Sequence, residues 1–89
     1  MISGTLIEKE RIPEIKFANA EIDQTMHYRQ VLKYFERLGN EFKGKCSISF
    51  NTTEGIRTVN TTVWSVTEDY CQLKGGISIP LRSITEVRL

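Results

Sequence analysis

The strongest constraint on the fold of this chain is a change in the spacing of its apolar residues near residue 43. Over residues 23–38, apolar side chains recur every three or four positions, which is the period of one face of an α-helix. From residue 43 onward, apolar and polar residues alternate, which is the period of a β-strand. One helix followed by strands predicts an α+β or mainly β domain.

The predicted helix has a clear start, end and buried face. Asp23 or Thr25 is suited to accept hydrogen bonds from its first N–H groups, and Gly39 with Asn40 is suited to close its end. Its apolar face consists of Tyr28, Val31, Leu32, Phe35 and Leu38.

Two further groups of side chains lie away from that face. Arg29, Lys33 and Arg37 recur every fourth position and form a basic stripe. Met26 and Tyr34 also point away from the main apolar face, so they are candidates for contact with a partner. A basic stripe is usually a solvated helix face, and it is also the arrangement that contacts phosphates.

Five strands are expected after the helix, of roughly 8, 12, 5, 4 and 5 residues. The second, over residues 56–67, is unusually long, and its apolar residues change sides: Val59 and Val63 face one way, Trp64 and Val66 the other. A bent or bulged strand that serves two sheets produces such a shift. Short antiparallel strands with tight turns then predict a small closed barrel, with residues 23–89 as a single helix-plus-barrel domain.

Residues 1–22 read as an extended arm or an edge strand. Ile15 and Phe17 alternate with charged residues, and Pro13 disfavours a central strand. The arm packs either on its own barrel or on that of a neighbour, and the sequence leaves both arrangements open.

The sequence offers little to catalysis or to metal binding. His27 is the only histidine, and no motif places Cys46 or Cys71 beside it as a nucleophile or as a zinc ligand. We therefore expect no catalytic residues, no cofactor and no metal, and we interpret both cysteines as buried hydrophobic residues. No apolar run is long enough to cross a membrane, and no secretory leader is evident, so the expected location is the cytoplasm.

The order of elements resembles the Sm-like form of the SH3-like barrel, as in the bacterial Sm-like RNA chaperone family. The resemblance covers residues 24–88, and the stretch "YCQLKGGISIPLRSITEV" is similar to the third, fourth and fifth strands of such barrels. It implies a ring of subunits with an RNA pore. Where that family has a basic motif, this chain has residues 79–82, "IPLR", so no binding residue is carried over.

These observations favour a non-enzymatic module that binds a protein partner or itself. A barrel this small has little core, and self-association is a common supplement. The candidate contacts are Ile15, Phe17, Met26, Tyr34 and Trp64. Trp64 is either a core residue or an interface anchor. The alternative is RNA binding through Arg29, Lys33, Arg37 and Arg82, although a net charge of +1 gives nucleic acid no strong general attraction.

Overall fold

A computed structural model describes residues 5–42 and 45–88, without the side chains of residues 5, 9, 35 and 38–42. In chain order, its elements are β1 (Thr5–Ile7), the 3-10 helix η1 (Lys9–Glu14), α1 (Thr25–Phe42), β2 (Cys46–Thr52), β3 (Gly55–Thr61), β4 (Val63–Val66), β5 (Tyr70–Leu73), β6 (Ser78–Pro80), the 3-10 helix η2 (Leu81–Ser83) and β7 (Ile84–Arg88). The expected mainly β domain with a leading α-helix is confirmed.

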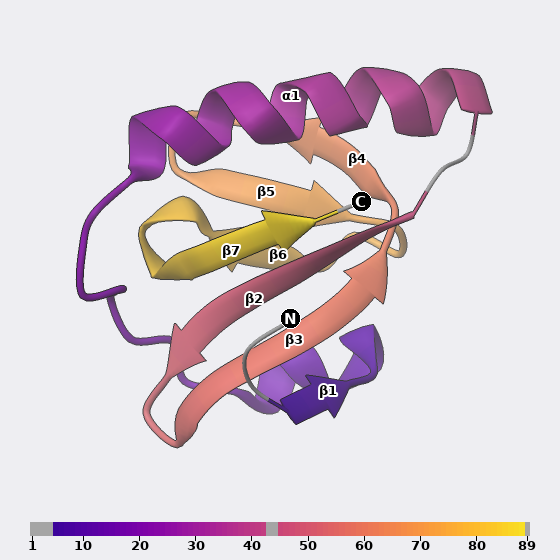
Figure 1. Cartoon of the computed structure of the whole chain (residues 1–89). Coiled ribbons are helices and arrows are strands. Elements are labelled where there is room, and N and C mark those ends of the chain that lie inside the picture. Colours follow the sequence, from indigo (N-terminus) through magenta and orange to yellow (C-terminus); the bar gives the residue numbers. More distant parts are fainter. Residues whose placement is uncertain (1–4, 43–44, 89) are drawn as a thin grey trace.

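The described strands form two sheets (Figure 1). The four-stranded sheet has the order β1-β3-β2-β7, in which β1 runs parallel to β3 and the other neighbours are antiparallel. The antiparallel three-stranded sheet has the order β4-β5-β6. Because neither sheet closes on itself, the expectation of a single closed five-stranded barrel is wrong. The arm adds β1, and the expected long strand is divided into β3 and β4, so the described residues contain seven strands.

The bend in the long strand is confirmed and lies at Thr62, between β3 and β4. Val59 and Val63, on either side of it, are both buried. The register of β4 with β5 shifts between Val63 and Ser65, which leaves Trp64 as the additional residue of a bulge. One chain segment therefore joins the two sheets, and its bulge displaces Trp64 from the regular alternation.

The core is continuous from the arm to the last strand. Ile12 of η1, Leu32 of α1 and Phe50 of β2 are all fully buried in one cluster with residues of β3, β5, β6 and β7. Figure 1 shows α1 on one side of the sheets and η1 with β1 on the opposite side. The arm is therefore part of the core of its own subunit, which decides the question that the sequence left open.

The helix starts close to the expected position and ends later. Asp23 Oδ1 accepts hydrogen bonds from the Thr25 backbone N–H (3.0 Å) and hydroxyl (2.5 Å), and these bonds lower the pKa of the Asp23 carboxyl. The helix continues through Gly39 and Asn40 to Phe42, so the expected end at these residues is wrong. A glycine inside a helix costs only about 1 kcal/mol, which the rest of a helix offsets.

The apolar face of the helix is confirmed at Tyr28 and Leu32, which are buried, while Phe35 and Leu38 fall outside the described side chains. The Tyr28 hydroxyl also donates a hydrogen bond to the Thr85 carbonyl oxygen of β7 (2.8 Å). No helix in the described ranges is long and apolar enough to cross a membrane.

Candidate functional site

Trp64 is a surface residue. Its side chain is 50% exposed, although Val63 beside it is fully buried. Of the two roles that the sequence left open, the structure therefore favours the exposed one. Tyr70 and Gln72 of β5 are also exposed and alternate with the buried residues Cys71 and Leu73, so the outer face of the three-stranded sheet carries aromatic and polar groups.

That outer face contains a shallow depression of about 390 Å³. It is lined by Thr67, Tyr70, Gln72 and Ser78, all of them exposed. The lining combines one aromatic ring with hydroxyl and amide groups, which is the mixture found at the rims of protein interfaces.

Met26 and Tyr34 are exposed as expected, at 72% and 60%, but they do not form one patch with Trp64. Val66 contacts Glu36, and Glu68 contacts Arg29, so β4 runs antiparallel to α1 (Figure 1). Trp64 therefore lies toward the end of the helix, and Met26 lies at its start. Tyr34 is two residues from Glu36, so helical geometry places it on nearly the opposite side of α1.

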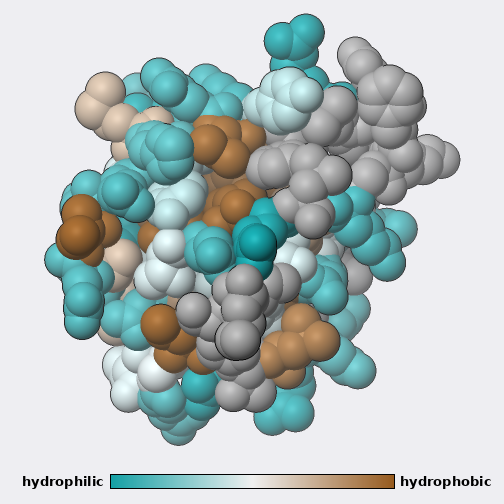
Figure 2. Space-filling view, in the orientation of Figure 1, coloured by the Kyte–Doolittle hydropathy of each residue, from teal (hydrophilic) through white to brown (hydrophobic). Residues whose placement is uncertain are grey.

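On the face seen in Figure 2, hydrophobic side chains emerge in small separate patches among hydrophilic ones. Single anchors, rather than one broad apolar surface, are what this chain offers to a partner on this face.

Ile15 and Phe17 were expected to be partner contacts, and they pack instead against their own core. The Phe17 ring lies 5.6 Å from the Phe50 ring, and Phe17 forms an isolated β-bridge with Thr52. Both side chains are only partly buried in these contacts, so the interface at these two residues stays a prediction.

The basic stripe is divided by the fold. The Arg29 guanidinium donates two hydrogen bonds to the Glu68 carbonyl oxygen, from Nε (3.2 Å) and from Nη2 (2.6 Å). Arg29 thus ties α1 to the turn between β4 and β5, which uses two of its five N–H donors. Its role as a phosphate contact stays a prediction. Lys33 and Arg37 of α1 and Arg82 of η2 are exposed.

The thiols are placed as expected. Burial raises the pKa of Cys46 to about 11 and that of Cys71 to about 12, so both are protonated at neutral pH and poor nucleophiles. His27 is exposed, and its ring contacts the edge of Tyr28. The described residues hold no cluster of three or more histidine, cysteine or acidic side chains that is suited to a metal ion.

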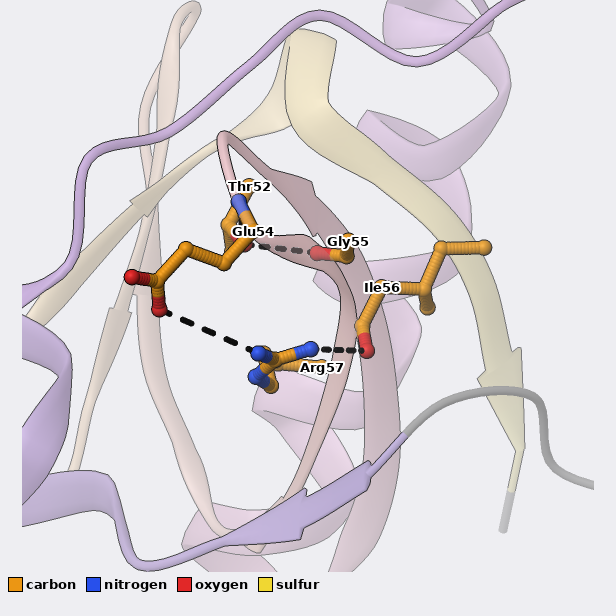
Figure 3. A network of polar contacts seen from close by, with 5 residues as sticks. All are labelled: Thr52, Glu54, Gly55, Ile56 and Arg57. Atoms are coloured by element: carbon orange, nitrogen blue, oxygen red, sulfur yellow. Dashed lines mark hydrogen bonds and ion pairs between the residues drawn. The ribbon is translucent and has the colours of Figure 1, made fainter.

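A second polar cluster surrounds the hairpin between β2 and β3 (Figure 3). Thr52 Oγ1 accepts the Glu54 backbone N–H (3.1 Å) and donates to the Gly55 carbonyl oxygen (2.6 Å). Arg57 Nη1 donates to the Ile56 carbonyl oxygen (3.1 Å), and Arg57 Nη2 lies 3.9 Å from Glu54 Oε2. Gly55 adopts φ +110°, which favours glycine at this turn.

The sequence analysis did not identify Arg57 or Tyr70 as candidate site residues. Arg57 follows Ile56 in an alternating strand, where a charged residue is normally assigned to the solvent side. The register shows otherwise, because Arg57 pairs with Phe50, a core residue. The alternation of side chains along a strand could have revealed this, because it places Arg57 on the same face as Val59 and Thr61.

No protein-family model, no curated protein and no solved structure matches this chain.

Proposed function

We propose that this protein is a non-enzymatic, SH3-like or Sm-like module that associates with a second copy of itself through the surface around Trp64. The observation that carries the proposal is the half-exposed Trp64 indole at a bulge beside a complete core. Burying an aromatic side chain of this size contributes about 2–3 kcal/mol, and tryptophan is enriched among the residues that dominate interface energies.

The strand order supports the SH3-like or Sm-like part of the proposal. The order β7-β2-β3 continues through the bend at Thr62 into β4-β5-β6, and the 3-10 helix η2 separates β6 from β7. A leading helix, a bent strand and a 3-10 turn before the last strand are the features on which the resemblance rests. In this chain the strands form two separate sheets, so the arrangement is an open version of such a barrel.

The surroundings of Trp64 suit a second copy of the chain. The outer face of the same three-stranded sheet also carries Tyr70, which is 44% exposed, and a depression lined by hydroxyl and amide groups. The net charge of +1 on 89 residues produces little repulsion between identical molecules. An exposed aromatic anchor, a sheet face with aromatic and polar groups, and a nearly neutral overall charge are compatible with association of identical subunits.

The test is the mass of the protein in solution, measured by light scattering over a wide range of concentrations. Wild type is expected to pass from monomer to a defined oligomer, and Trp64→Ala to weaken this association by at least about 30-fold, as for an interface hot spot. Tyr34→Ala is the matched control, since it removes an exposed aromatic residue from the far side of α1.

Two results would contradict the proposal. One is a wild-type monomer at every concentration, and the other is equal assembly of wild type and Trp64→Ala. If the purified protein carries nucleic acid, and its release depends steeply on salt and on Lys33 and Arg37, RNA binding replaces self-association as the function.

A further inference from the structure

Arg57 is a charged residue on the inner face of the four-stranded sheet. Its register partner is Phe50, and it lies on the same face of β3 as Val59, both of which are fully buried. Only 24% of the Arg57 side chain is exposed. A guanidinium in such a position is costly unless its donors are used.

The protein uses few of those donors. A guanidinium has five N–H groups. Within the described residues, Arg57 makes one hydrogen bond, to the Ile56 carbonyl oxygen, and one ion pair, to Glu54. The ion pair spans 3.9 Å, which is longer than a charge-assisted hydrogen bond of about 2.8 Å, and the Glu54 side chain is 83% exposed. Most of the donor capacity of Arg57 is therefore left for another acceptor.

Two cavities adjoin the Arg57 side chain, of about 590 Å³ and about 380 Å³. They share Glu14, Ile15, Glu54 and Arg57 in their linings, so Arg57 borders both. The larger cavity lies between the arm and the hairpin that Figure 3 shows, and its volume is typical of small-molecule sites.

The lining of the larger cavity combines three kinds of group. Ile7 and Ile15 provide an apolar wall. Arg11 and Glu14 form an exposed ion pair (3.6 Å), which leaves Glu8 as a carboxylate without an ion pair to another described residue. The cavity thus offers a cationic fork, a carboxylate and an apolar surface.

We propose that this cavity binds a small apolar α-amino acid as its zwitterion. Arg57 binds the ligand carboxylate, because a planar guanidinium matches a planar carboxylate with two parallel hydrogen bonds. Glu8 binds the ligand ammonium group, and the wall of Ile7 and Ile15 packs against its aliphatic side chain. A ligand with both charges satisfies Arg57 and Glu8 together, which neither a simple anion nor a simple cation does.

The test uses the full chain, with leucine as the probe and with binding measured by calorimetry and by amide NMR shifts. Saturable binding of leucine is expected, with the largest shifts at residues 54–57 and along the arm. Two analogues test each charge: 4-methylpentanoate lacks the ammonium group, and isoamylamine lacks the carboxylate. Each is expected to bind about 10- to 100-fold more weakly, as the loss of a charge-assisted contact predicts.

Three variants assign the contacts. Arg57→Gln is expected to abolish binding, and Arg57→Lys, which retains the charge and the fold but not the fork, to weaken it about 10-fold or more. Glu8→Gln is expected to weaken binding of leucine but not of 4-methylpentanoate. Arg82→Gln is the matched control, because Arg82 is exposed and lies outside both cavities, and it is expected to leave binding unchanged.

The proposal is overturned if leucine shows no saturable binding to the folded wild-type protein. It is also overturned if Arg57→Lys binds leucine as wild type does, or if inorganic phosphate binds as tightly as leucine, which would indicate a general anion site. Self-association is measured separately, so either proposal can fail while the other stands.

Discussion

The two ends of the bent strand β3–β4 depart in opposite ways from the usual rule that charged residues are exposed and large aromatic residues are buried. At the Arg57 end, a charged residue lies on the core side of the sheet and is largely covered by the arm. At the Trp64 end, the only tryptophan of the chain is left half exposed beside a complete core. Departures of this kind are most often retained at functional sites. We propose that these two departures mark two separate sites, one for a small zwitterionic ligand and one for a protein surface.

The largest effect is expected at the Arg57 end, from removing the buried side chain that anchors the arm to the core. Ile12 is fully buried in the common core, so Ile12→Ala is expected to lower the free energy of unfolding by about 2–5 kcal/mol. Urea denaturation measures this change. A loss below about 1 kcal/mol would mean that the arm does not belong to the core in solution, and the Arg57 cavity would then lack one wall.

At the second end, Glu36 joins the helix to the edge of the three-stranded sheet. Its Oε1 accepts a hydrogen bond from the Val66 backbone N–H (2.8 Å). Glu36→Ala leaves this donor without its acceptor and is expected to destabilise the protein by about 1.5–3 kcal/mol, as for a hydrogen bond to a charged group. Glu36→Gln retains an acceptor and is expected to cost less in the same urea titration. Equal losses in both variants would contradict the role of this bond.

The hairpin can be tested with two glycines. Gly55 (φ +110°) and Gly76 (φ +83°) both adopt a conformation that alanine resists, so each alanine variant is expected to cost about 1–2 kcal/mol. A Cβ at Gly55 would also lie 3.5 Å from Arg57 Nη1, whereas a Cβ at Gly76 would meet no atom within 4 Å. The contact at Gly55 is an ordinary van der Waals one, but the backbone strain there falls in the hairpin that carries Arg57. Gly55→Ala alone is therefore expected to weaken leucine binding. If Gly76→Ala weakens it equally, the effect does not arise at Arg57.

The smallest expected effect concerns the thiols and pH. The pKa values of about 11 for Cys46 and about 12 for Cys71 lie above those of unfolded thiols, so the unfolded chain loses these protons first as pH rises. Their contribution to stability is fully present well below the unfolded pKa of 9.0 and is lost as pH rises through that value toward the folded pKa values. The loss at pH 9 is roughly 0.4 kcal/mol per thiol. Urea titrations of wild type and of a Cys46→Ala, Cys71→Ala double variant measure this slope. The same slope in both would contradict the assignment.

Much of the architecture was predictable because it depends on local periodicity. The spacing of Tyr28 and Leu32 identified the helix, and the change of apolar parity between Val63 and Trp64 identified the bend and the bulge. The strands after the helix were found for the same reason. These features follow from which residues must face one core.

The missed features depend on contacts between distant segments. Ile12 stands among charged residues and before Pro13, so its sequence context gives no sign that it is buried; only the parallel pairing of β1 with β3 and the position of η1 place it in the core. The partial burial of Arg57 depends on the same arm, whose residues line the cavity beside it. The sequence could not decide whether Trp64 is buried or exposed, because a bulge residue belongs to neither regular face of a strand.

The central claim is that the two ends act independently, and one NMR experiment tests it directly. Amide and indole resonances of the wild-type protein are recorded first on dilution and then during addition of leucine. Dilution is expected to move the Trp64 indole N–H resonance but not the Arg57 amide, and leucine is expected to move the Arg57 amide but not the indole. An indole resonance that is unchanged on dilution, or one that moves together with Arg57 when leucine is added, would contradict the claim.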